Sequence, residues 1–268
     1  MTDINLRARG PIPVQGDMSD EERAMRRDLA AAYRLVALNG WDDMIGTHIS
    51  ARLPTPPGEP EQFLINPYGM LFERVTASSL VKIDVEGNIL SDSPYPVNKA
   101  GFVVHSAVHM ARPEVACVMH LHTNDGVAVS ALEEGLLPLN QTAMIVRRRL
   151  SFHDYEGVAV ELGERERLVE HLGNNDLMLL RNHGTLSTGR TVAEAYSSMY
   201  SLEKACTFQV RTLSMGQPWR MPDADVLAKF DKMGHNDPEG IVKSNYANKA
   251  VWPALLDRLE RVCPDYKD

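Results

Sequence analysis

Apolar residues recur along this chain with two spacings, one typical of helices and one typical of strands. Ser19–Glu22 has the spacing of a capping box, so we expect a helix to begin there and to end at Gly40. A second capping box, Thr191–Glu194, predicts a helix that runs to about Leu213. The apolar stripe of the first helix follows the 3.6-residue period at Met25, Leu29, Tyr33 and Val36.

Between these two helices the apolar runs are short and strand-like, and turns rich in proline or glycine separate them. Short strands that alternate with capped helices are compatible with a layered α/β domain, although the pattern alone does not identify the architecture. We expect strands over 47–53, 62–65, 81–84 and 115–123, a second apolar run over 177–184, and helices over about 102–111 and 125–132.

The organisation predicted from the pattern is one domain with two flanking segments. Residues 1–18 form an N-terminal arm, 19–216 the main domain and 217–268 a helical extension of the same domain. In the extension, Trp252, Leu255, Leu256 and Leu259 lie at helical spacing and could cover an interface or a pocket.

Composition limits the function classes. The 268 residues are 44% hydrophobic, enough for one sizeable core. No apolar run approaches the roughly 18 residues of a membrane span, and the N-terminus lacks the apolar segment of a secretory signal. The net charge of −8 argues against a nucleic-acid partner. Three widely spaced cysteines indicate reduced thiols, so we expect a cytoplasmic protein with a small-molecule substrate.

The chemistry centres on three histidines at the ends of two apolar runs. Side chains alternate along a strand, so His120 and His122 project from one face. His183 follows the second run, where Gly184 would let the backbone turn sharply away. Three imidazoles can hold one divalent ion and leave a position open for substrate. Each histidine could equally be an ordinary hydrogen-bonded residue.

Several motifs resemble the class II aldolase/adducin family over about residues 20–216. These motifs are 111–115 (Ala-Arg-Pro-Glu-Val), 120–123 (His-Leu-His-Thr), 181–184 (Arg-Asn-His-Gly), 46–52, 65–69 and 80–87. The resemblance implies a three-layer α/β domain whose central, mainly antiparallel sheet is flanked by helices. It also implies a metal ion bound by His120, His122 and His183, and an active site between the subunits of a homotetramer. We expect zinc, with Fe(II) or Mn as alternatives.

The chain departs from the sugar-phosphate aldolases of that family at the positions that carry their chemistry. Those enzymes have a Ser-Ser-Glu whose serines hold phosphate and whose glutamate moves the proton. Lys99, Ala100 and Gly101 stand there in this chain, and His48 replaces an asparagine of the phosphate loop. The segment Pro96–Phe102 is instead similar to the adducin-like branch. That branch includes a non-enzymatic cytoskeletal head domain and metal-dependent enzymes that act on aromatic acids.

The missing glutamate leaves the proton-transfer group to be identified. His48, His153 and Tyr155 are the candidates, because imidazole and phenol groups can exchange protons. We expect Gly101 to leave room beside the metal and His48 to face the metal pocket, although His48 could merely cap a strand end. The segment 151–157, which carries His153 and Tyr155, could rim the pocket or form a hydrated turn.

The segment 66–70 could be a simple turn that uses Pro67 and Gly69 for its backbone angles. The resemblance instead implies a ligand loop with Asn66, Tyr68 and Gly69 as substrate-binding residues. His105 and His109 share a helix face, and we interpret both as structural. The pair Glu203–Lys204 is most simply explained as a surface pair on a helix.

Three hypotheses for the function follow. The first is a metal-dependent carbon–carbon lyase, catalysing retro-aldol cleavage or decarboxylation of a small hydroxy- or keto-carboxylate. The second is a non-haem iron oxygenase acting on an aromatic 2-keto or 2-hydroxy acid, because three histidines with open positions also suit Fe(II). The third is a non-catalytic adducin-like binding module, against which the intact histidine trio argues.

Overall fold

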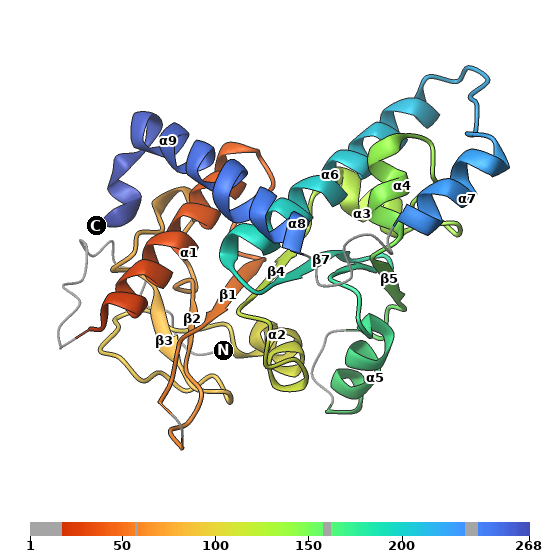
Figure 1. Ribbon diagram of the computed structural model, residues 1–268. Coiled ribbons are helices and arrows are strands. Elements are labelled where there is room, and N and C mark those ends of the chain that lie inside the picture. The colour runs from red at the N-terminus through yellow and green to blue at the C-terminus, as the bar shows by residue number, and fades with distance from the viewer. Residues whose placement is uncertain (1–17, 57, 158–161, 234–240) are drawn as a thin grey trace.

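The computed structural model describes residues 18–56, 58–157, 162–233 and 241–268 (Figure 1). The predicted N-terminal arm, 1–18, therefore lies outside the described residues except for Met18. None of the helices in these four ranges is both long and apolar enough to cross a membrane.

A seven-stranded sheet forms the middle layer, in the order β3-β2-β1-β4-β7-β6-β5. Neighbouring strands are antiparallel except β5 and β6, which are parallel. The expected α/β domain with a central, mainly antiparallel sheet is thus confirmed. The strands are β1 (His48–Arg52), β2 (Phe63–Ile65), β3 (Val81–Ile83), β4 (Cys117–Leu121), β5 (Leu150–His153), β6 (Leu177–Leu180) and β7 (Gly184–Gly189).

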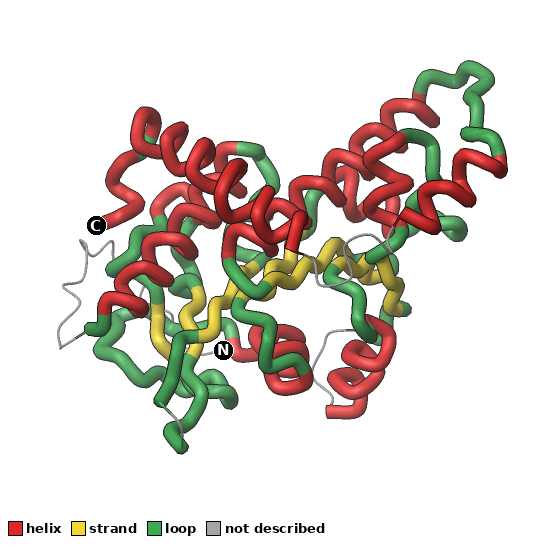
Figure 2. Tube along the Cα trace, viewed as in Figure 1, coloured by secondary structure: helices red, strands yellow, loops and turns green. Residues whose placement is uncertain are grey.

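Helices cover both faces of this sheet (Figures 1 and 2). Helices α1, α3, α4, α6 and α9 pack on one face, and α2 and α5 pack on the other. The helices are α1 (Asp20–Leu38), α2 (Lys99–Ala111), α3 (Asn124–Ser130), α4 (Gln141–Arg147), α5 (Leu162–Leu172), α6 (Val192–Ser214), α7 (Ala224–Met233), α8 (Ile241–Asn245) and α9 (Trp252–Val262). Shorter turns are the 3-10 helices η1 (Phe72–Arg74) and η4 (Pro264–Lys267) and the π-helical turn η3 (Tyr246–Val251).

Both predicted capping boxes begin helices. The Ser19 hydroxyl accepts a hydrogen bond from the Glu22 amide at 3.1 Å, and Thr191 does the same for the Glu194 amide at 3.1 Å. These bonds satisfy backbone donors that the first helical turn leaves without partners. Gly40, with φ of +65°, lies just beyond the end of α1, as expected.

The central strand β4 alternates as predicted. Its residues Cys117, Met119 and Leu121 pack with α1 and α6, whereas Val118 packs with α2 and α5 on the opposite face. The ladder pairs His48 of β1 with His120 of β4. The face that carries His120 is therefore the face that α2 covers.

The C-terminal segment returns to the N-terminal helix. Trp252 and Leu259 are buried in the cluster that surrounds α1, and the Trp252 indole N–H donates to the Asp28 carboxylate at 2.9 Å. Their helical spacing correctly indicated a covering helix. The surface that they cover is α1 and α6, not the histidine cluster.

Candidate metal centre

His120 and His122 are positioned by the end of β4 and the start of α3. His120 is the fourth residue of the strand, and His122 follows the last. Thr123 then caps α3, because its hydroxyl accepts from the Gly126 amide at 3.0 Å. The strand therefore holds the backbone of His120, and His122 has little freedom between the end of the strand and the capped start of the helix.

His183 lies in the turn between β6 and β7. The sharp turn uses Asn182, whose φ is +57°, so the expectation that Gly184 supplies it is wrong. Asparagine tolerates the left-handed conformation better than most residues. Gly184 serves a different purpose, because a Cβ there would lie 2.4 Å from the Leu121 carbonyl oxygen. The glycine lets β7 approach β4 closely and so brings His183 to the other two histidines.

The three imidazoles converge. Each offers a ring nitrogen, and these nitrogens lie within 4.8 Å of one another. The ring centroids of His120, His122 and His183 are 4.7 to 4.8 Å apart. Among the described residues this is the one cluster of histidine, cysteine or carboxylate side chains with that geometry.

Two hydrogen bonds assign the protons of this cluster. The Nδ1 of His120 donates to the Thr185 carbonyl at 3.0 Å, and the Nδ1 of His122 donates to the Asp43 carboxylate at 3.1 Å. Neutral rings held in this way present bare Nε2 atoms, and these two Nε2 atoms are 3.0 Å apart. Two lone pairs at that distance repel unless a cation lies between them. The donor set therefore fits a divalent ion.

Burial and neighbouring imidazoles keep two of these candidate ligands, His120 and His183, neutral. Burial, reinforced by the neighbouring imidazoles, lowers the pKa of His120 well below its ordinary value. Burial and the nearby His122 lower the pKa of His183 to about 4. Imidazole binds metal only when it is deprotonated, so both rings are in the binding form at neutral pH.

Asp43 orients His122 and was not anticipated. It lies in the loop between α1 and β1, where the sequence offers no periodic pattern to mark it.

Glu203 was misinterpreted as half of a surface pair. It is 1% exposed on α6, and it accepts hydrogen bonds from the hydroxyls of Thr123 and Thr185, the latter at 2.7 Å. Thr123 directly follows His122, and Thr185 supplies the carbonyl that orients His120. Helical spacing from the buried Tyr196, Met199 and Cys206 would have identified its inward orientation.

Glu203 is expected to make stability depend on pH. Burial raises its pKa from 4.5 to about 7, so the folded protein binds this proton more tightly than the unfolded chain does. The resulting stabilisation is present below about pH 4.5 and is lost as the pH rises through about 7. The wild-type protein should therefore lose up to about 3 kcal/mol of its free energy of unfolding between pH 4.5 and 8, and Glu203→Gln should not show this loss. Urea unfolding at pH 4.5 and pH 8 measures the stability of both proteins, and Glu134→Gln, at an exposed position, is the control. A stability difference between Glu203→Gln and wild type that is the same at both pH values would contradict the prediction.

His48 lies next to the cluster in the neighbouring strand. Its ring is 5% exposed, and its centroid is 5.6 Å from that of His120. Burial lowers the pKa of His48 to about 4, so the ring is neutral at pH 7. Its Nδ1 is 2.9 Å from the Nε2 of His105. His48 thus adjoins the cluster, and its catalytic role stays a prediction.

The room expected at Gly101 is filled by His48. A Cβ at position 101 would lie 2.0 Å from the Nε2 of His48. No side chain larger than hydrogen fits at 101 while this ring stays in place. The two departures from the aldolase pattern are therefore sterically linked.

A double-mutant cycle tests this link. We expect Gly101→Ala to cost about 1–3 kcal/mol, the usual range for overpacking, because His48 is buried and hydrogen-bonded. In the His48→Ala background the same change should be neutral or favourable, because alanine is a better helix former than glycine. Chemical denaturation of the four proteins gives the coupling energy. Equal costs in both backgrounds would contradict the clash.

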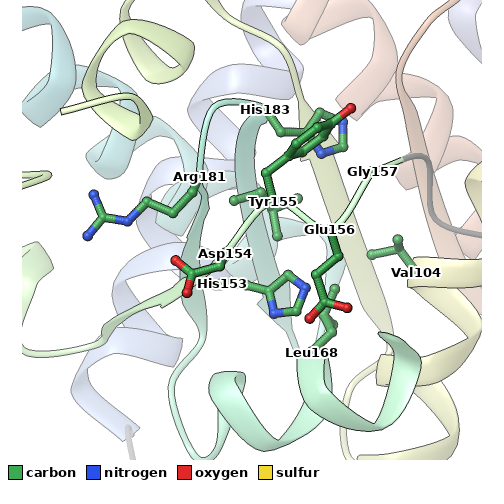
Figure 3. Close-up of a pocket in the computed structure, with 10 residues that line it drawn as sticks. Val104, His153, Asp154, Tyr155, Glu156, Gly157, Leu168, Arg181 and His183 are labelled. Carbon is green, nitrogen blue, oxygen red and sulfur yellow. The ribbon is translucent and has the colours of Figure 1, made fainter. Parts of the chain in front are cut away.

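A pocket beside His183 contains the two other proton-transfer candidates (Figure 3). It lies between the segment after β5, helix α5 and the turn that carries His183. Tyr155 is 56% exposed, with its ring centroid 6.1 Å from that of His183. The His153 Nδ1 is 2.9 Å from the His171 Nδ1. The buried Nε2 of His153 has no hydrogen-bond partner within the described ranges. Residues 153–157 of the segment 151–157 therefore line a pocket that also contains His183.

Two hydrogen bonds anchor the segment 66–70. The Tyr33 hydroxyl donates to the Asn66 side-chain oxygen at 2.8 Å, and the Tyr68 amide donates to the Pro96 carbonyl at 2.9 Å. Gly69 has a φ of +95°, as a turn requires. The turn is thus confirmed, and a substrate-binding role for Asn66, Tyr68 and Gly69 stays a prediction.

Known proteins share this arrangement of sheet and motifs. Residues 27–210 match the family described as Class II Aldolase and Adducin N-terminal domain. This chain belongs to the class II aldolase/adducin family. A protein of Caulobacter vibrioides named "Putative aldolase class 2 protein" is 51% identical, over 97% of this chain and 100% of its own length. Alpha-adducin of Rattus norvegicus is 43% identical over 74% of this chain, which corresponds to 27% of that longer protein.

A solved structure agrees. The crystal structure of an aldolase II superfamily protein from Pseudomonas syringae superposes with a TM-score of 0.85 at 44% identity, covering 94% of this chain and 98% of the other. The class II aldolase/adducin resemblance and the fold expected from it are confirmed. Class II aldolases generally use a divalent metal ion, and the three histidines form a site of suitable composition.

Proposed function

We propose that this protein is a divalent-metal-dependent carbon–carbon lyase that acts on a small hydroxy- or keto-carboxylate. The observation that carries this proposal is the set of three converging imidazoles, of which His120 is oriented by Thr185 and His122 by Asp43, beside a pocket that contains His153 and Tyr155. A non-catalytic module would have no use for donors oriented in this way.

His120, His122 and His183 would hold the ion, and we propose zinc. When bound, such an ion supplies positive charge that polarises a carbonyl group and stabilises negative charge on it. Imidazole donors also suit Fe(II) and Mn. Metal identity is therefore part of the test below.

The chain's own residues supply the proton transfers. We assign proton acceptance to His48, whose neutral ring adjoins His120. The exposed Tyr155 hydroxyl can donate a hydrogen bond to substrate oxygen in the pocket. The Nε2 of His153, which has no partner among the described residues, can orient the substrate. The loop with Asn66, Tyr68 and Gly69 is proposed to contact the remainder of the substrate.

Cleavage of ordinary sugar phosphates is not part of this proposal. Gly101 cannot transfer a proton, and Lys99 and Ala100 replace two phosphate-binding serines of the aldolases that this chain resembles. Because a positioned general acid or base contributes about 10²–10⁴-fold, we expect at most very weak cleavage of fuculose 1-phosphate or ribulose 5-phosphate.

We further propose a homotetramer in the cytoplasm. The C-terminal part of α6 and the segment after it expose several large apolar side chains, which supports burial against another subunit. These are Phe208, Met215, Trp219 and Met221. All three cysteines are free, as in a reducing compartment. Light scattering on the eluting peak of a sizing column measures the assembly.

Metal analysis combined with a substrate panel tests the lyase proposal. Protein purified without chelator should contain zinc, and a metal-loaded sample should release an aldehyde or CO₂ from short hydroxy- or keto-carboxylates. The metal-stripped sample should not. Stoichiometric iron with O₂ consumption would overturn the proposal in favour of an oxygenase. Absence of turnover with zinc, manganese and iron would favour a binding module.

A further inference from the structure

Four buried polar side chains form a continuous chain of hydrogen bonds behind His48. The His48 Nδ1 is 2.9 Å from the His105 Nε2, and the His105 Nδ1 is 2.7 Å from the Ser50 hydroxyl. The same hydroxyl is 2.8 Å from the His109 Nε2. The His109 Nδ1 finally lies 3.3 Å from the Val115 carbonyl oxygen.

The sequence pattern explains why these side chains meet. His48 and Ser50 are two residues apart on β1 and so project from the same face of the strand. His105 and His109 are four residues apart on α2 and so share one side of the helix. Helix α2 packs on that face of β1, and all four side chains are at most 5% exposed. Both histidines of α2 are buried and hydrogen-bonded, and they connect with the candidate base.

The last acceptor, the Val115 carbonyl oxygen, determines the direction of every hydrogen bond in this series. A carbonyl oxygen can only accept, so the His109 Nδ1 carries a proton and its Nε2 is bare. Ser50 must then donate to His109 and accept from the His105 Nδ1–H. The His105 Nε2 is therefore bare and accepts from the Nδ1–H of His48. A neutral His48 is left with an unprotonated Nε2.

Electrostatics at His109 prevent its protonation, which would reverse the direction of these hydrogen bonds. Burial and the neighbouring Arg52 guanidinium lower the pKa of His109 to about 3. The Arg52 guanidinium also donates to the His109 carbonyl oxygen. From the other elements packed against these four side chains, the titratable groups that face them in the described ranges are the His120 ring of β4, which acts on His105, and the rings of His122 and His183, which act on His48. A ring next to a fixed cation stays neutral, so the chain remains a set of neutral tautomers.

We propose that His105, Ser50 and His109 are positioning residues that hold His48 in the Nδ1–H tautomer, with the lone pair of Nε2 available as a base. That Nε2 lies over Gly101, and no side chain in the described ranges hydrogen-bonds to it. Whether the base acts on a substrate rests on the proposed function. The tautomer itself depends only on the chain of hydrogen bonds.

The Nδ1–H tautomer of His48 favours one class of substrate among the hydroxy- and keto-carboxylates. A bare Nε2 accepts a proton, so it fits a substrate that presents a hydroxyl group, as in retro-aldol cleavage of a 4-hydroxy-2-keto carboxylate. The hydroxyl proton passes to Nε2, the C3–C4 bond breaks, and its electron pair forms the enolate of a 2-keto acid while C4 leaves as an aldehyde. The proton on Nε2 then returns to C3. Decarboxylation begins with no such proton to accept.

Nitrogen-15 NMR of the imidazoles tests the tautomer without any substrate. We expect the zinc-loaded protein to show a proton on the Nδ1 of His48 and an unprotonated Nε2, with resonances assigned by loss in His48→Gln. In Ser50→Ala the ratio of the two tautomers should shift about fivefold toward Nε2–H, the effect of one ordinary hydrogen bond. Ser50→Thr, which keeps the hydroxyl, should restore the ratio.

The matched control is Ser187→Ala. Ser187 is also a buried strand serine, and its hydroxyl donates to the Ala195 carbonyl, outside this chain of hydrogen bonds. A wild-type His48 that carries its proton on Nε2 overturns the inference even if the enzyme is a lyase. The Nδ1–H tautomer without any lyase activity supports the inference and rejects the proposed function. The wild-type spectrum decides the point even if a variant does not fold.

Discussion

Replacement of His122 by alanine is expected to reduce bound divalent metal from about one ion per chain to a trace. Removing His122 leaves two imidazoles in the cluster, and the Asp43 carboxylate then has no ring to orient. Loss of an orienting partner alone typically costs 10–100-fold in metal affinity, so loss of the ligand should cost more than about 10²-fold. Asp43→Asn should give the intermediate effect.

Metal content after gel filtration and competition with a chromogenic chelator measure both variants. His171→Ala is the matched control, because it removes an exposed imidazole that lies outside the cluster. We expect this control to retain the wild-type metal content. A folded His122→Ala protein that binds one ion with wild-type affinity would contradict the proposed ligand set.

Replacement of His48 by alanine is expected to lower kcat by about 10²–10⁴-fold while metal content stays unchanged, the usual loss for a general base. His48 adjoins His120 but is not one of the three converging ligands. His48→Gln should lose as much, because an amide cannot accept the proton. The expected KM changes little, because the base acts on the substrate mainly in the transition state.

Parallel Tyr155→Phe and His153→Gln variants separate the three candidates. Full turnover of His48→Ala on an identified substrate would assign His48 a purely structural role. The proton acceptor would then have to come from the pocket beside His183.

Local pattern predicted the elements that carry a capping box or a regular period, because capping and periodicity depend on neighbouring residues. It did not predict α4, α5, β5 or β7. Ser19 and Thr191 cap α1 and α6 as expected, and the alternation in β4 correctly placed His120 and Met119 on opposite faces. The motifs around His120 and His183 also indicated the family, and they predicted the candidate ligand set. These features are written in short stretches of sequence.

Contacts between distant segments decided the rest. Glu203 lies 80 residues from its partner Thr123, and Asp43 lies 79 residues from His122, so no local pattern could connect either pair. The room at Gly101 likewise depended on where β1 placed the His48 ring.

By itself the sequence determined the capped helices α1 and α6, the two faces of β4 and the candidate trio His120, His122 and His183. The caps and the strand faces depend on spacing along the chain, and the trio also rests on the family resemblance. The tertiary structure alone decided which nitrogen is bare in the rings of His120, His122 and His48. That choice depends on the acceptor opposite the other nitrogen: Thr185 for His120, Asp43 for His122 and His105 for His48. An imidazole has two nearly equivalent tautomers, and only a partner brought close by folding selects between them.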